Sequence, residues 1–157
     1  MKILNQFKII RANGYEDFSQ IALRETLRLT KGFKQKLLLL PTGNSPTGFY
    51  KEFTHYLNKN TNEKKRFFFT NLDEYLHISQ SSKISFQSYL KRNISNKLNL
   101  SEKNFYWIDN KTPIEIEKRK INFIIKKFTK IDLCILGLGK NGHIAFNEPG
   151  CDWNLDF

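Results

Sequence analysis

The stretch LLLLPTGNSPTGFYKEF, residues 37–53, contains the elements that decide the fold of this chain. A continuous apolar run over Lys36–Leu40 is typical of a buried parallel strand, because helices cover both faces of such a strand. A short glycine-containing turn follows it. The segment Pro46–Leu57 is then predicted to be a helix, with Ser45 as its N-cap and Pro46 as its first residue. A strand that turns directly into a helix is typical of the α/β class.

Strands and helices alternate on both sides of this unit as well. The predicted strands are Phe7–Arg11, Lys36–Leu40, Arg66–Thr70, Phe105–Ile108 and Ile131–Leu136, and the predicted helices are Tyr15–Leu29, Pro46–Leu57, Ser85–Ile94 and Pro113–Phe128. This order predicts one α/β domain over residues 1–157, built on an open, mostly parallel sheet with helices on both faces. The ligand site of such a sheet lies beyond the carboxyl ends of its strands.

Composition favours a folded globule without a membrane span. The chain of 157 residues is 39% hydrophobic and 14% aromatic, and no apolar run approaches the roughly 20 residues that cross a bilayer. The first seven residues are too polar for a signal peptide. Cys134 and Cys151 form no C-x-x-C pair and suit a reduced, cytoplasmic protein, and Cys134 is expected to be a buried apolar residue.

The formal net charge of +11 raises the question of a nucleic-acid partner. The lysines, however, are scattered along the chain, and the densest cluster, Lys64–Arg66, precedes a strand. We therefore expect no nucleic-acid partner and no membrane partner. A basic field of this size also attracts anionic phosphorylated metabolites.

The turn after the first buried strand has the features of an anion site. Thr42, Gly43, Asn44 and Ser45 stand between a strand and a helix N-terminus, where free N–H groups and the positive end of the helix dipole meet. The Walker A spacing and its lysine are missing. An ordinary turn with a serine cap explains the same residues equally well, so both interpretations remain open at this point.

Two adjacent acids, Asp73 and Glu74, follow the strand that ends near Thr70. A carboxylate that is partly desolvated at the mouth of a sheet has a raised pKa and can act as a general base. An aspartate that caps the following turn is the alternative, and it is a common use of this residue.

The stretch GLGKNG, residues 137–142, matches the G-x-G-x-x-G pattern of dinucleotide-binding loops. In a dinucleotide fold this pattern belongs to the first strand–helix unit, and an acid follows about 20 residues later. Here it comes last, and Pro149-Gly150 would break a long helix. The other interpretation is a tight turn that presents His143, with Glu148 orienting the imidazole. No His or Cys cluster predicts a metal site.

Taken together, the segments LPTGNSP, NLDEY, SFQSYLKRNI and GLGKNGHIAFNEPG resemble the glucosamine-6-phosphate deaminase and galactosamine-6-phosphate isomerase family. The resemblance runs from about Phe7 to Gly150. This family shares its fold with 6-phosphogluconolactonase, whose pattern usually reads DER where this chain has DEY. A lactonase-like hydrolase is therefore the second choice, beside galactosamine-6-phosphate isomerase and a non-catalytic remnant.

The resemblance implies deamination of an amino-sugar 6-phosphate by acid–base chemistry, without a cofactor or a metal. It places the substrate phosphate on Thr42–Ser45. It implies that His143, held by Glu148, assists opening of the sugar ring, and that Asp73 moves a proton between C2 and C1. A homo-oligomer is a possible assembly.

Two departures from the family pattern stand out. The family position two residues before the histidine is often Asp, whereas this chain has Asn141, an amide that orients a histidine without stabilising its charge. The family also continues with further strand–helix units that supply a basic residue and a lid. We therefore expect this domain to be C-terminally incomplete.

Overall fold

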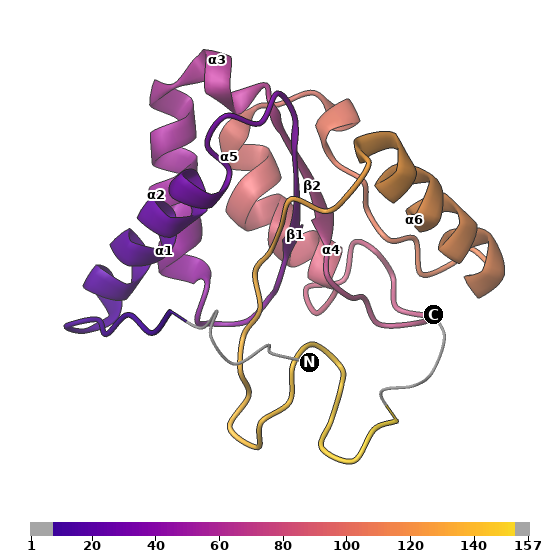
Figure 1. Cartoon of the computed structure of the whole chain (residues 1–157). Helices are drawn as coiled ribbons and strands as arrows, with labels where there is room; N and C mark the ends of the chain where they lie inside the picture. The colour runs from indigo at the N-terminus through magenta and orange to yellow at the C-terminus, as the bar shows by residue number, and fades with distance from the viewer. Residues whose placement is uncertain (1–7, 153–157) are drawn as a thin grey trace, which may run out of the picture.

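Three parallel strands form one sheet in the computed structural model, which describes residues 8–152. They are β1 (Lys36–Leu40), β2 (Phe67–Asn71) and β3 (Leu133–Cys134), arranged in the order β2–β1–β3. Leu38 in the central strand pairs with Phe69 on one side and with Leu133 on the other. Because all three strands run the same way, their carboxyl ends meet at one end of the sheet, its lower end in Figure 1.

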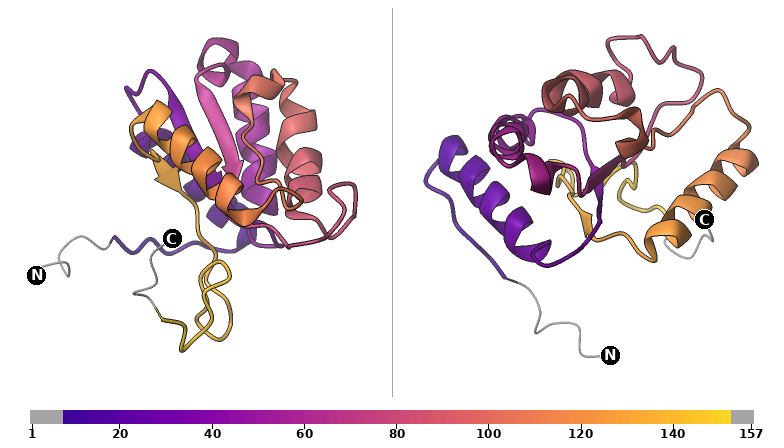
Figure 2. Two further views of the ribbon diagram at one scale, coloured as in Figure 1. Left: turned by 90° about the vertical axis from the view of Figure 1, so that its right-hand side faces the viewer. Right: turned by 90° about the horizontal axis from the view of Figure 1, so that it is seen from above.

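Helices cover both faces of the sheet, as the alternation of elements predicts. The helical elements are α1 (Tyr15–Leu29), α2 (Thr47–Lys59), α3 (Thr61–Lys64), α4 (Phe86–Leu90), the π-turn η1 (Lys91–Ser95), α5 (Asn96–Leu98), the 3-10 turn η2 (Glu102–Asn104) and α6 (Ile114–Phe128). Seen from above, α1 and α2 lie on one side of the sheet and α6 lies on the other (Figure 2).

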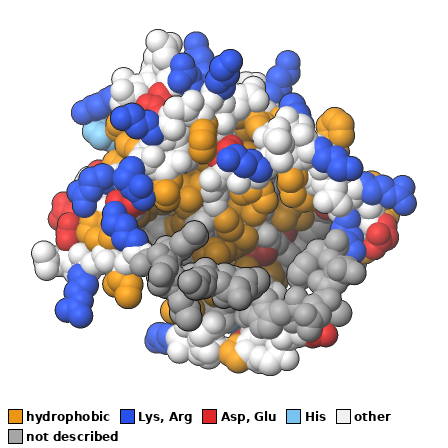
Figure 3. Space-filling view, viewed as in Figure 1, with side chains coloured by type: hydrophobic (Ala, Val, Ile, Leu, Met, Phe, Trp, Pro, Cys, Tyr) orange, Lys and Arg blue, Asp and Glu red, His pale blue; other side chains and the backbone are white. Residues whose placement is uncertain are grey.

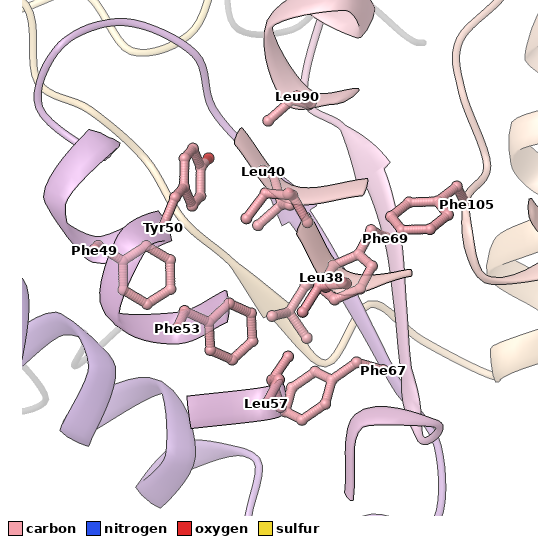
Figure 4. Packing of buried hydrophobic residues seen from close by; sticks show 12 residues of the cluster. Leu38, Leu40, Phe49, Tyr50, Phe53, Leu57, Phe67, Phe69, Leu90 and Phe105 are labelled. Atoms are coloured by element: carbon pink, nitrogen blue, oxygen red, sulfur yellow. The ribbon is translucent and has the colours of Figure 1, made fainter. Parts of the chain in front are cut away.

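The main core lies between the sheet and α2. Leu38 and Leu40 point to this face because side chains alternate along a strand, and they pack with aromatic residues of α2 and β2 (Figure 4). Phe53 stacks on Phe49 at 5.2 Å and meets the edge of Phe67 at the same centroid distance. Full burial of each such side chain stabilises the fold by roughly 1.5–3 kcal/mol. The core thus fixes the direction in which β1 enters the turn at Pro41.

Predictions for the segments at the heart of the domain are confirmed. Tyr15–Leu29 and Lys36–Leu40 have the predicted bounds, and the helix predicted over Pro113–Phe128 begins one residue later, at Ile114. The predicted strand Arg66–Thr70 is shifted by one residue to Phe67–Asn71.

The other predicted strands are shorter than their apolar patterns suggested. The strand predicted over Phe105–Ile108 is reduced to a single bridge between Phe69 and Phe105. Ile131–Leu136 is a strand only at Leu133–Cys134, since β3 has a strand partner on one side only among the described residues. Phe7 lies outside the described residues. Residues 8–11, the rest of the same predicted strand, belong to no strand of the sheet. Cys134, expected to be buried, is exposed at this edge.

The predicted bounds of two helices were also wrong. Helix α2 spans Thr47–Lys59 where Pro46–Leu57 was predicted, so Pro46 takes the N-cap position, and no side chain of the preceding turn caps the helix. The helix predicted over Ser85–Ile94 does begin after Ser85, whose hydroxyl accepts a hydrogen bond from the Ser88 N–H. It then continues through η1 to Leu98 and ends where Asn99 adopts a left-handed conformation.

Charge is spread over the molecular surface. On the face shown in Figure 3, Lys and Arg side chains occupy many separate places and form no continuous stripe. Among residues 8–152, none of the helices is both long enough and apolar enough to cross a membrane.

Candidate active site

A cavity of about 450 Å³ lies at the carboxyl ends of the strands. Its walls come from three separate parts of the chain, namely residues 41–46 after β1, Leu72, Asp73 and Tyr75 after β2, and the C-terminal loop 137–148, with Phe86 of α4 beside them. The C-terminal loop lies directly below the sheet in Figure 1. Seven of the eight residues singled out in the sequence line this cavity, and the eighth, Asn141, lies behind His143.

The loop after β1 presents unpaired backbone donors. Gly43 has a φ of +102°, a left-handed conformation that glycine adopts without strain. Within the described part of the chain, the backbone N–H groups of residues 42–45 have no hydrogen-bond partner. They stand at the N-terminus of α2, where the helix dipole adds positive potential. No Lys or Arg of the described residues lines the cavity, so these backbone N–H groups are the main positive potential that an anion meets there.

Asp73 enters the cavity from the end of β2. The side chain of Asn71, which is buried, donates to the Asp73 carbonyl oxygen at 2.8 Å and accepts from the Ile108 N–H at 2.9 Å, so it fixes the backbone at this point. Partial burial, helped by the nearby Glu74 carboxylate, raises the pKa of Asp73 to about 6. A carboxyl group with such a pKa is suited to accept and return a proton near neutral pH.

Glu74, the neighbour of Asp73 in the chain, has a structural role that its sequence pattern does not indicate. Its carboxylate accepts hydrogen bonds from the Ser85 hydroxyl and from the backbone N–H groups of Phe86 and Gln87, all between 2.8 and 3.0 Å. It thereby ties the loop that carries Asp73 to the start of α4. The two adjacent acids therefore differ, because Glu74 is fully engaged while the Asp73 side chain faces the cavity.

His143, Asn141 and Glu148 form a chain of hydrogen bonds. Asn141 donates from Nδ2 to the Glu148 carboxylate at 2.6 Å, and this turns its Oδ1 atom toward His143 Nδ1, 2.7 Å away. An amide oxygen only accepts, so this contact places the proton of neutral His143 on Nδ1 and leaves Nε2 as a free acceptor. Glu148 lies 3.5 Å from Nδ1 and so orients the ring mainly through Asn141.

The glycines of residues 137–142 shape a turn around this histidine. The Gly139 N–H donates to the His143 carbonyl oxygen at 2.9 Å, and Gly142 has a φ of +90°. No helix begins between Gly137 and Asp152, whereas a dinucleotide loop leads directly into one. Within residues 8–152, no three His, Cys, Asp or Glu side chains come together as a metal site would require.

An aromatic cluster joins the C-terminal loop to the other two walls. Phe146 lies 5.3 Å from Tyr75 and 5.5 Å from Phe86, and these two rings are 4.7 Å apart. The cluster connects residues that are up to 71 positions apart in sequence. In the sequence, each of these aromatic residues stands inside one of the motifs, and nothing in the motifs indicates that the three rings meet.

Known structures share this architecture. The fold superposes on that of a monomeric glucosamine-6-phosphate deaminase with a TM-score of 0.84 and 27% identity, covering 95% of this chain and 62% of that one. It also superposes on 6-phosphogluconolactonase from Thermotoga maritima with a TM-score of 0.72 and 21% identity, covering 88% and 62%. The protein therefore has the α/β fold that is common to these two classes of enzyme.

Sequence comparison gives relatives of the first class. The chain is 33% identical over 145 residues to glucosamine-6-phosphate deaminase of Clostridium perfringens, covering 91% of this chain and 60% of the relative. It is 37% identical over 145 residues to the enzyme of that name from Clostridium novyi, covering 90% and 59%. No family model matches the chain. Over nearly its whole length the chain is thus similar to proteins named glucosamine-6-phosphate deaminase, and it spans about 60% of their length.

Proposed function

We propose that this chain acts on an amino-sugar 6-phosphate and converts glucosamine 6-phosphate and water into fructose 6-phosphate and ammonia. The observation that carries the proposal is the convergence of three loops on one cavity: the N–H groups of residues 42–45, the carboxyl group of Asp73 and the imidazole of His143. The similarity to deaminases named for this substrate supports the choice of reaction.

The phosphate of the substrate is assigned to the loop Thr42–Ser45. Its unpaired N–H groups and the N-terminus of α2 stabilise negative charge, and Gly43 lets the phosphate approach the backbone closely. Binding at this end leaves the other end of the sugar free to extend along the cavity toward Asp73 and His143.

His143 is assigned to ring opening. With its proton held on Nδ1 by Asn141, the Nε2 atom accepts the proton of the C1 hydroxyl and returns a proton to the ring oxygen as the C1–O5 bond breaks. The product of this step is the open-chain aldehyde. Glu148 maintains the orientation of Asn141 through the second hydrogen bond of the amide.

Asp73 is assigned to the isomerisation. As a carboxylate it removes the proton from C2 while the C1 oxygen takes up a proton, which gives an enolamine. Asp73 then delivers the proton that it holds to C1, and the amino group releases a proton in return for the one taken up by the oxygen. The nitrogen at C2 is now an imine, and water hydrolyses it to the ketone and ammonia. Because the pKa of Asp73 is about 6, the side chain is mostly ionised at neutral pH and still holds the proton long enough to return it.

The proposal is tested by measuring ammonia release from glucosamine 6-phosphate and galactosamine 6-phosphate side by side, with hydrolysis of 6-phosphogluconolactone as a third assay. We expect ammonia from at least one amino sugar. Asp73→Asn should abolish deuterium exchange at C2, followed by NMR, while phosphate affinity changes less than twofold. Lactone hydrolysis without ammonia release would overturn the proposal, and normal C2 exchange in the variant would remove Asp73 from its role.

A further inference from the structure

Three tyrosines from three different helices meet at the loop between β1 and α2. The Tyr50 hydroxyl of α2 donates to the Pro41 carbonyl oxygen at 2.5 Å, and the Tyr89 hydroxyl of α4 donates to that of Gly43 at 2.5 Å. The Tyr15 hydroxyl of α1 lies 2.9 Å from the Asn44 carbonyl oxygen and 3.1 Å from that of Ser45. None of the three tyrosines lines the cavity.

These contacts determine where the loop N–H groups point. A trans peptide unit directs its C=O and the next N–H to opposite sides, and the described residues contain no cis peptide bond. Carbonyl groups that bind tyrosines outside the cavity therefore turn the N–H groups of Thr42, Asn44 and Ser45 toward it. These are N–H groups that have no partner in the described part of the chain.

Tyr15 also replaces the helix cap that the sequence had assigned to Ser45. Its hydroxyl accepts a hydrogen bond from the Gly48 N–H, in the first turn of α2, at 2.8 Å. The close approach of α1 and α2 depends on glycine at this position, because a Cβ on Gly48 would lie 2.2 Å from the Ser19 hydroxyl and 2.9 Å from the Tyr15 ring.

Tyr50 and Tyr89 are dependable donors. Burial raises the pKa of both phenols above the ordinary value, so that both are protonated at neutral pH. Tyr89 also contacts the Thr47 hydroxyl at 3.1 Å, which connects its ring to the first residue of α2. All three hydroxyls thus bind carbonyl groups of the same five-residue loop, Pro41–Ser45, and they do so outside the cavity.

We propose that Tyr15, Tyr50 and Tyr89 are positioning residues that hold the loop Thr42–Ser45 in its anion-binding conformation, with the phosphate group of the substrate as the ligand. This inference rests on the proposed function and adds a set of residues to it. The tyrosines act through the backbone of the loop and do not contact the reacting atoms.

The test compares single hydroxyl deletions in the full chain. Tyr15→Phe and Tyr89→Phe each remove one donor, whereas Tyr56→Phe removes a hydroxyl of α2 that binds Glu63 at 3.1 Å, away from the loop. Dissociation constants for inorganic phosphate and glucosamine 6-phosphate are measured by calorimetry. We expect the first two variants to bind both ligands about five- to tenfold more weakly and Tyr56→Phe to stay within twofold of the wild type.

Two further readouts separate positioning from general stability. Phosphate should shift the amide NMR signals of Thr42, Asn44 and Ser45 in the wild type and in Tyr56→Phe, and shift them less in Tyr15→Phe and Tyr89→Phe. In the ammonia assay, KM should rise while kcat stays constant, because Asp73 and His143 belong to other loops. If Tyr15→Phe does not fold, the affinity of Tyr89→Phe decides the question.

The outcomes also separate this inference from the proposed function. Affinities of Tyr15→Phe and Tyr89→Phe within twofold of the wild type would overturn the positioning role, even if the wild type releases ammonia. Weakened phosphate binding in these variants supports the role, even if no ammonia is released and the proposed reaction fails. A wild-type chain that binds no phosphate compound overturns both.

Discussion

The imidazole ring of His143 lies against the backbone of Gly139, so closely that a Cβ at position 139 would stand 2.3 Å from the Cε1 atom of the ring. Non-bonded carbon atoms do not approach to this distance. The glycine at position 139 is therefore required by the histidine, for a reason that involves no nucleotide.

Gly139→Ala should displace His143 from Asn141 and lower kcat for ammonia release by about 100-fold, as expected for a catalytic group that moves by about 1 Å. Phosphate affinity should not change, since the loop Thr42–Ser45 is separate. Gly137→Ala is the matched control, because a Cβ there meets no heavy atom within 4 Å. Equal kcat values for the two variants would contradict the assigned role of His143.

Asp73→Asn should stabilise the fold at alkaline pH. The pKa of Asp73 rises from 3.8 to about 6 on folding, so the stability linked to its protonation is fully present below pH 3.8 and is lost as the pH rises through 6. The variant avoids this loss. After a discount for solvent screening of the half-buried group, we expect it to be about 1 kcal/mol more stable at pH 8, with the difference vanishing near pH 4.

Urea unfolding at both pH values measures this difference, and Asp109→Asn supplies a control of opposite sign. Hydrogen bonds from the Lys111 N–H and the Thr112 hydroxyl lower the pKa of Asp109. The ionised form of Asp109 therefore stabilises the fold at pH values above the pKa of the unfolded state. This stabilisation is lost as the pH falls through the lower pKa of the folded state. The control should be less stable than the wild type at pH 8. If Asp73→Asn were less stable than the wild type at pH 8, this would show that burial does not destabilise the ionised carboxylate of Asp73.

Asn141→Leu should lower kcat about tenfold with little change in KM. Leucine has a similar size but neither holds the proton of His143 on Nδ1 nor binds Glu148. Because Asn141 is exposed, the thermal midpoint should stay close to that of the wild type. Asn58→Leu, near the C-terminal end of α2 and outside the cavity lining, is the control. An unchanged kcat in Asn141→Leu would mean that Glu148 orients the imidazole without the amide.

Phe146→Ala should loosen the C-terminal loop. Its ring is the link between this loop and the pair formed by Tyr75 and Phe86, and aromatic pairs of this kind add about 0.5–1.5 kcal/mol beyond their burial. Hydrogen exchange at the amides of Gly139 and Asn147 should become faster, while exchange in β1 remains constant. Phe123→Ala, on the solvent side of α6, should leave all of these rates unchanged. Unchanged exchange in Phe146→Ala would exclude the cluster as the anchor of the loop.

Local patterns were sufficient for the elements whose residues carry their own signal. Lys36–Leu40 is apolar throughout, and Tyr15–Leu29 has acidic residues at its start and a glycine after its end, so both were predicted with their observed bounds. The three loops that line the cavity were also predicted, because each follows a strand of a parallel sheet. Segments at the edge, such as Ile131–Leu136, were predicted too long, since pairing depends on a neighbouring strand and not only on composition.

The sequence by itself determined the α/β class, the order of the loops and the residues that meet at the cavity, because each of these follows from patterns within a few neighbouring positions. Only the tertiary structure decided the partners of those residues. Tyr15 caps α2 from 33 positions away, Glu74 binds the start of α4, and Asn141 stands between Glu148 and His143. Such hydrogen bonds depend on how closely the packed elements approach, and the packing is set by the core as a whole.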